Sequence, residues 1–198
     1  MQMQIFRRVV LGLMALGLTV SVFAILSCGG SDDNNDGIQR QANMQGANER
    51  PPLPVPTSAS GSDVLAISAD RTQIQYVLTY NGLTNVVQAH IHEGDATVAG
   101  QVILYLCANG ALKANAPVPP PDCPAGSSVT VTGTLTAANL ITRASQGNRP
   151  AVTSFADAVA LLIDGVTYSN VHTDDGVAPT NTGPGDFPGG EIRGQNQP

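Results

Sequence analysis

The sequence predicts a mainly β domain, either a β-sandwich or a partly closed Greek-key barrel, with one or two short helices in the connections. The clearest signal is alternation: Ile74, Tyr76, Leu78 and Tyr80 occupy every second position, as in a half-buried strand. The chain contains 21 glycines and 14 prolines but no tryptophan, a composition typical of short strands joined by tight turns. An Asn-Gly turn signal directly follows this strand, at Asn81.

Several further segments have strand character, and they recur at short intervals along the chain. They are residues 64–68, 87–91, 101–107, 128–135, 166–172 and 191–195.

Two connections are predicted to be helical. Residues 136–140 can form one turn that begins at Thr136. Residues 154–163 place apolar side chains at helical spacing, with Ser154 as an N-cap candidate and Gly165 just beyond the end.

The charge balance argues against nucleic acid as a partner. The formal net charge is −6, the isoelectric point is near 4.7, and only nine residues are Lys or Arg. Nucleic-acid binding domains need a basic surface that neutralises phosphates, and no such stripe is present in the sequence.

The first residues of the chain have the layout of a secretory signal. Arg7 and Arg8 precede an apolar run over residues 9–26, which stops at Ser27 and Cys28. A transmembrane anchor is the alternative, because the run is near the minimum length for a span. The polar tether that follows, without a cluster of positive charges, favours the signal.

This segment resembles the lipobox of bacterial lipoproteins, in which Cys28 becomes the lipid-modified first residue of the mature chain. The resemblance implies a signal peptide over residues 1–27, a flexible lipid-anchored tether over 28–37 and a folded domain over 38–198. It also implies an exported protein held to a membrane through lipid on Cys28. Gly29 after the cysteine resembles lipoproteins that are sent to an outer membrane.

The remaining two cysteines, Cys107 and Cys123, form an even pair in an exported domain, which predicts a disulfide. They enclose a loop rich in Ala, Asn and Pro that has little apolar side-chain bulk to pack. Closing a loop of this length stabilises a fold by roughly 3 kcal/mol. A metal-binding pair or two free thiols are less favoured interpretations in an oxidising compartment.

Four motifs in order along the chain resemble those of the CHRD domain, a module repeated in animal chordin and found singly in many bacterial exported proteins. They are GANERPP at residues 46–52, AHIHEG at 89–94, GTLTAANL at 133–140, and the terminal pair YSNVHT at 168–173 and GGEIRGQ at 189–195. The resemblance covers residues 38–197 and implies a β-sandwich-like domain whose biochemical role is poorly defined. The growth-factor partner of chordin does not transfer to a bacterial lipoprotein.

The chain has only three histidines, His90, His92 and His172, and all of them lie within these motifs. On a strand, His90 and His92 point to one face, opposite Ala89 and Ile91. If the strand that carries His172 is adjacent, three imidazoles converge. Such a set can bind zinc or copper with one coordination position open.

The alternative is that the histidines are hydrogen-bonded structural groups, with Asn170, Glu93 and Glu191 as candidate partners. Family motifs are frequently structural, so the sequence favours the structural role of the histidines over metal binding. The two differ in geometry, because imidazole nitrogens within about 4–5 Å of one another indicate a metal site.

Glu191 and Arg193 are two positions apart and are expected to share a face of the last strand. They form either a binding-site pair or, as the sequence favours, an ion pair that closes the strand. No pattern singles out a catalytic serine. The acidic residues Asp174, Asp175 and Asp186 lack the spacing of an EF-hand, which favours solvated loop charges over a calcium site.

The sequence therefore predicts a non-enzymatic binding or structural module of the cell envelope, with a protein or small molecule as its unidentified partner. The alternative is an envelope protein that binds copper or zinc through the three histidines.

Overall fold

A computed structural model describes residues 37–50 and 54–198 of the chain. The predicted signal peptide, Cys28 and nearly all of the tether lie outside the described residues. Within the part that is described, no helix is long and apolar enough to cross a membrane.

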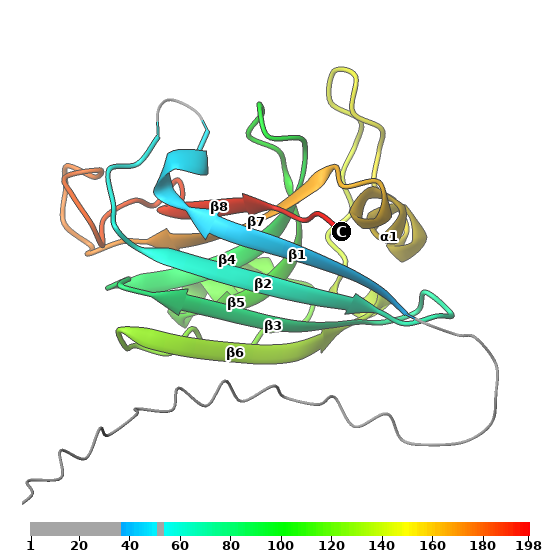
Figure 1. Cartoon of the computed structure of the whole chain (residues 1–198), viewed down its shortest axis with the longest axis horizontal. Coiled ribbons are helices and arrows are strands. Elements are labelled where there is room, and N and C mark those ends of the chain that lie inside the picture. Colours follow the sequence, from blue (N-terminus) through cyan, green and yellow to red (C-terminus); the bar gives the residue numbers. More distant parts are fainter. Residues whose placement is uncertain (1–36, 51–53) are drawn as a thin grey trace, which may run out of the picture. The chain divides into compact units, whose positions relative to one another are not determined.

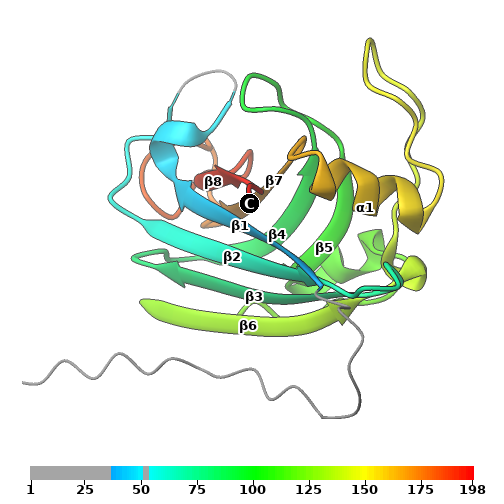
Figure 2. The same ribbon diagram turned by 45° about the vertical axis from the view of Figure 1, so that its right-hand side comes forward.

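One antiparallel sheet of eight strands forms the described domain, in the order β5-β4-β7-β8-β1-β2-β3-β6. The strands curve around a common interior, so that β1, β2, β3 and β6 face β4 and β5 (Figures 1 and 2). The bounds are β1 (Ile38–Gln45), β2 (Ser60–Ile67), β3 (Ile74–Asn81), β4 (Val86–Glu93), β5 (Val102–Ala108), β6 (Ser128–Leu135), β7 (Thr167–Thr173) and β8 (Ile192–Gln195). The fold is therefore the nearly closed barrel of the two predicted alternatives.

The barrel interior is apolar because every second residue of its strands points inward, as the alternation in the sequence predicted. Ile74, Tyr76, Leu78 and Tyr80 of β3 are all buried, and they pack with the inward residues of the other strands. The hydroxyl of Tyr76 crosses to the edge strand β5 and donates a hydrogen bond to the Leu106 carbonyl at 2.6 Å. This bond links the two ends of the sheet, β3 near one edge and β5 at the other.

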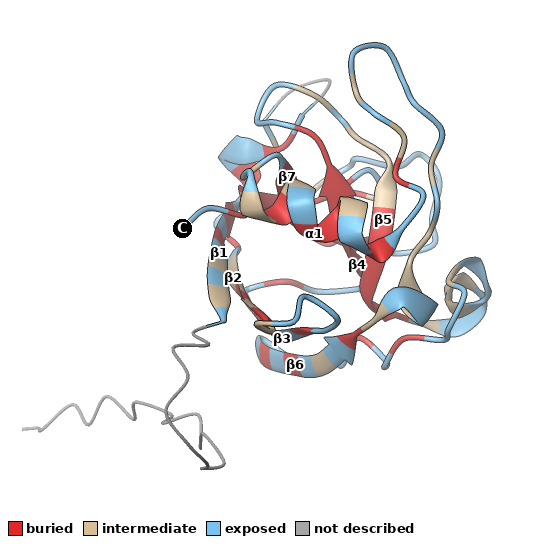
Figure 3. Cartoon of the chain, turned by 90° about the vertical axis from the view of Figure 1, so that its right-hand side faces the viewer, coloured by how far each residue is buried: buried red, intermediate tan, exposed pale blue. Residues whose placement is uncertain are grey.

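Helix α1 (Phe155–Ile163) lies across one end of the barrel (Figure 3). Its predicted N-cap is confirmed, because Ser154 and Asp157 form a reciprocal capping box. Phe155 and Leu162 are buried against the core. At the C-terminal end of the helix, Arg40 of β1 donates to the carbonyls of Leu162 and Ile163. The Leu162 carbonyl also accepts from the Gly165 amide.

The shorter connections are 3-10 turns. The predicted turn after β6 is η3 (Ala137–Asn139), with Thr136 as its N-cap in a capping box. Two further turns, η1 (Gly46–Asn48) and η2 (Gly110–Asn115), have no counterpart among the sequence predictions.

The predicted disulfide between Cys107 and Cys123 is present and both cysteines are buried. It ties the end of β5 to the loop that leads into β6. Asn109 supports the same junction, because its side chain donates to the Cys123 carbonyl and accepts from the Cys123 amide.

Strands β4 and β7 are buried on both faces over most of their length (Figure 3), as are their neighbours β5 and β8. In β6, by contrast, buried and exposed residues alternate along most of the strand. The outward side chains of β4 and β7 are polar, so loops that pack over the outside of the barrel enclose a polar layer. That layer contains the three histidines.

The acidic residue Asp63 is fully buried on the core-facing side of β2. Its Oδ2 accepts a hydrogen bond of 2.7 Å from the hydroxyl of Ser169, and Oδ1 has no partner among the described residues. Burial raises the pKa of Asp63 from 3.8 to about 7, although the bond from Ser169 acts in the opposite direction. The folded state therefore holds a proton on Asp63 over a pH range in which the unfolded chain has lost it.

Removing the disulfide with Cys107→Ala and Cys123→Ala together should lower the free energy of unfolding by about 3 kcal/mol, because the unfolded chain regains the entropy of an open loop. Urea denaturation of both proteins measures the difference. An unchanged midpoint would show that the loop is held without the covalent bond.

The Asp63 carboxyl should make stability fall as pH rises from about 4 to 7, by up to about 1.4 kcal/mol per pH unit. Asp63→Asn removes this contribution, so the stability of the variant relative to wild type should increase with pH over the same range. Urea denaturation at pH 4.5, 5.5, 6.5 and 7.5 measures both slopes, with the exposed Asp122→Asn as control. Parallel slopes for Asp63→Asn and wild type would contradict the prediction.

Candidate functional site

The histidines lie on the outward face of β4 and β7. Ala89 and Ile91 of β4 belong to the barrel core, and the alternating positions His90 and His92 point away from it. Antiparallel pairing places Asn170 opposite His90, and it places Tyr168 opposite His92. The third histidine, His172, pairs with Gln88 one position further along the same face.

The structure brings all three histidines together and buries them. One ring nitrogen from each of His90, His92 and His172 lies within 4.8 Å of the others. The Nδ1 of His90 is 3.1 Å from the Nε2 of His172, a hydrogen-bond distance. The Nε2 atoms of His90 and His92 are also buried, and neither has a hydrogen-bond partner among the described residues.

Two of the rings are oriented by backbone carbonyls. The Nδ1 of His92 lies 2.9 Å from the Gly100 carbonyl, and the Nδ1 of His172 lies 2.9 Å from the Pro188 carbonyl. A carbonyl oxygen only accepts, so each Nδ1 carries the hydrogen and donates it. In the neutral rings, each Nε2 then carries a lone pair. That of His172 faces the Nδ1 of His90, whereas that of His92 has no partner among the described residues.

The environment keeps the three imidazoles neutral. Burial is the main cause in each case, and it lowers the pKa of His92 to about 3 and that of His172 to about 4. The pKa of His90 is also well below its ordinary value, because of burial and of the two neighbouring imidazoles. Neutral imidazole is the protonation state in which histidine binds metal ions.

Asn170 adjoins the histidines, and Glu49 adjoins Asn170. The Oδ1 of Asn170 is 3.0 Å from the Nε2 of His172. Glu49 is buried nearby, and burial raises its pKa to about 7 against the opposing effects of Arg193 and Asn170. Gly190 has φ of +123°, and a Cβ at that position would lie 2.5 Å from the Glu49 Oε1. Glycine at position 190 of the 189–195 motif therefore leaves room for the Glu49 carboxyl.

A stack of side chains supports His92. The ring of Tyr168 is nearly parallel to the His92 ring, with 4.7 Å between centroids, and the Arg193 guanidinium lies 3.4 Å from the Tyr168 centroid. Arg193 also donates to the carbonyls of Val98 and Asp95. These bonds hold the 94–100 loop over the site.

Glu191 and Arg193 do not form the predicted ion pair in the described structure, and they do not act on a common partner. Glu191 precedes β8, and its carboxyl accepts hydrogen bonds from Thr57, Thr173 and the Gly185 amide. Arg193 instead contacts Tyr168 and the 94–100 loop. Glu191 therefore fixes the 174–191 loop, whereas Arg193 fixes the other cover of the histidine site.

The structural alternative for the histidines named three hydrogen-bond partners, of which only Asn170 contacts a histidine. The side chain of Glu93 points away from His92, and Glu191 is occupied by its own three donors. Sequence reasoning did not identify the Gly100 and Pro188 carbonyls. Both are main-chain groups in loops, so no residue-type signal marked them.

The acidic group at Asp174, Asp175 and Asp186 is also brought together, with one oxygen of each within 4.8 Å of the others. Asp186 is buried and not solvated as expected, because its Oδ2 accepts from the amide and hydroxyl of Thr182. The side chains of Asp174 and Asp175 accept amides two residues ahead, as in ordinary Asx turns.

Comparison with known proteins supports the motif-based resemblance. The family model of the CHRD domain matches residues 40–196, which span almost the whole described domain. Neither the curated proteins nor the solved structures contain a match to the chain.

Proposed function

The chain belongs to the CHRD domain family, and we propose that its single domain is a non-enzymatic metal-binding module of the cell envelope. In this proposal His90, His92 and His172 hold one copper or zinc ion. The observation that carries it is the pair of Nδ1-to-carbonyl hydrogen bonds, which leave the Nε2 lone pairs of His92 and His172 in the cluster. Metal-binding histidines almost always donate their second ring nitrogen in this way.

The purely structural alternative explains the cluster less well. Buried polar atoms are nearly always hydrogen-bonded, because removing them from water is otherwise costly. Two ring nitrogens, His90 Nε2 and His92 Nε2, are buried without a partner among the described residues. A bound cation would satisfy lone pairs at this position.

The ligand chemistry narrows the choice of ion. Three neutral imidazoles suit zinc and copper, and copper(II) binds a given set of nitrogen ligands more tightly than zinc does. Metal–nitrogen bonds are about 2.0–2.1 Å long, which places two nitrogens on one tetrahedral ion about 3.3 Å apart. Any ligand nitrogens near the 4.8 Å limit of the cluster must therefore move closer when an ion binds. Because all three rings are buried, a large substrate could not reach the ion. The burial therefore favours a site that binds the metal over one that uses it in catalysis.

The full chain, purified without a histidine tag, should bind one Cu²⁺ or Zn²⁺ per molecule. His90→Ala and His172→Ala should each weaken binding by on the order of 100-fold, about 2.7 kcal/mol, because each removes one of three ligands. Isothermal titration and elemental analysis after dialysis measure affinity and stoichiometry.

Gln88→Ala is the matched control, because Gln88 lies on the same strand face without belonging to the cluster. It should bind metal as wild type does. Wild-type protein that takes up neither ion at micromolar concentration would rule out the proposed function.

We also propose that the domain is exported and anchored through lipid on Cys28, with an outer-membrane address. The signal-like residues 1–27 and the polar tether after Cys28 support this proposal. The tether would let the domain stand away from the lipid surface.

Cys28→Ser should yield a protein that is exported but released from membranes, because the lipid acceptor is lost. Fractionation of cells that express each form, followed by immunoblotting, measures the distribution. Unchanged membrane retention of the variant would indicate an uncleaved apolar helix instead of a lipid anchor.

A further inference from the structure

A second candidate site lies on the other side of β4 from the histidines, where an open pocket of about 840 Å³ adjoins Glu93. Its walls come from the 94–99 loop, the 146–150 segment and the neighbourhood of α1, which project at the same end of the barrel (Figure 1). A volume of this size is within the range of small-molecule sites in proteins.

Glu93 is the polar group at the base of this pocket. It follows His92 directly, and strand alternation therefore turns its side chain to the opposite face. The residue is only 2% exposed. Both carboxyl oxygens are buried, and neither accepts a hydrogen bond from any described residue. A buried carboxyl group without donors is costly, so this arrangement indicates a missing partner.

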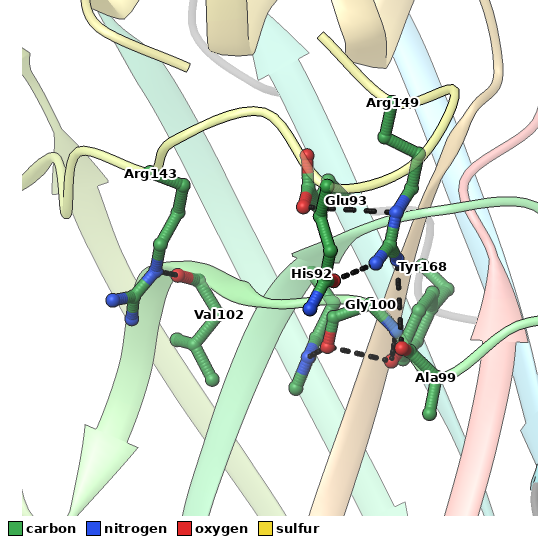
Figure 4. A network of polar contacts seen from close by, with 9 residues as sticks. His92, Glu93, Ala99, Gly100, Val102, Arg143, Arg149 and Tyr168 are labelled. Atoms are coloured by element: carbon green, nitrogen blue, oxygen red, sulfur yellow. Dashed lines mark hydrogen bonds and ion pairs between the residues drawn. The ribbon is translucent and has the colours of Figure 1, made fainter. Parts of the chain in front are cut away.

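Arg149 is the nearest cation to Glu93, but it does not supply that partner. Its Nε forms a long ion pair with the Glu93 Oε1 at 4.0 Å, which is too far for a hydrogen bond (Figure 4). The guanidinium is engaged elsewhere, since it donates to the Gln146 side chain and to the Ala99 carbonyl. Arg149 therefore offsets part of the Glu93 charge, while both carboxyl oxygens still lack a hydrogen-bond donor among the described residues.

The other residues that line the pocket indicate which ligand it suits. Val98, Leu161 and Val166 contribute apolar side chains to its walls. The pocket also contains a second acidic residue, Asp95, whose Oδ1 accepts from the amide and hydroxyl of Thr97. With Glu93 and Asp95 against Arg149, the pocket carries a net negative charge and disfavours anions.

We propose that this pocket binds a small organic cation, with a protonated amine or guanidinium on Glu93 and an apolar body against Val98, Leu161 and Val166. Such a head group supplies the donors that the carboxyl oxygens lack, and its charge matches that of the pocket. The site is separate from the histidine cluster and does not depend on a bound metal, because the two sites use opposite faces of β4.

The test uses the metal-free full chain and two amine probes, 4-methylbenzylamine and hexylamine, with the matching alcohols and 4-methylbenzoate as comparisons. Binding is followed by chemical-shift changes of backbone amides. Both amines should bind and shift amides of the 94–99 and 146–150 segments, with affinities at least tenfold above those of the alcohols. The benzoate should not bind.

Glu93→Gln should weaken amine binding at least tenfold, because it removes the charge and keeps the size of the side chain. Asp122→Asn is the control, since it removes the same charge from an exposed residue outside the pocket, and it should change affinity less than twofold. Val166→Trp should block both amines by filling the pocket, which provides a second variant if Glu93→Gln does not fold.

Three results would each overturn the proposal. One is that neither amine binds at concentrations up to about 10 mM. Another is that the alcohols bind as well as the amines do, which would indicate an apolar pocket without a role for Glu93. The last is that folded Glu93→Gln or Val166→Trp binds the amines as wild type does. None of these results bears on metal binding by the histidines.

Discussion

The antiparallel pairing of β4 with β7 is the constraint on which the rest of the structure depends. It places Ala89 opposite Val171 within the core, and it sets His90 opposite Asn170 on the outward face. Because alternate residues of one strand serve both faces, a slip of one residue would exchange the apolar and polar sets. The packing of the barrel interior thus fixes the positions of the histidines, and burial of the core stabilises the site.

The outward polar layer is stable only because loops enclose it and supply hydrogen-bonding groups. The 94–100 loop contributes the Gly100 carbonyl and is held by Arg193, while the 174–191 loop contributes the Pro188 carbonyl and is held by Glu191. Each loop is thus held by one ionisable side chain near the start of β8: Arg193 within the strand and Glu191 just before it. The two anchors explain why the terminal motif at 189–195 contains both an acid and a base that do not pair with each other.

Local patterns in the sequence were sufficient to predict most of the barrel. Alternation identified β3, and the side chain of Ser154 identified the start of α1, because both signals act between near neighbours. The pairing of β4 with β7 joins residues about 80 positions apart and leaves no local signal. From the sequence, His172 could therefore be predicted to meet His90 only if their two strands were neighbours. Glu191 was misassigned because strand alternation does not extend into the loop before β8.

The most direct test of the central claim is X-ray absorption spectroscopy of the protein loaded with one equivalent of copper or zinc. The account predicts three imidazole nitrogens at about 2.0–2.1 Å from the metal, with the outer-shell scattering that imidazole rings produce. Because the chain contains only three histidines, that signal can come from no other residues. A first shell without imidazole, or one built from carboxylate oxygens, would contradict the account.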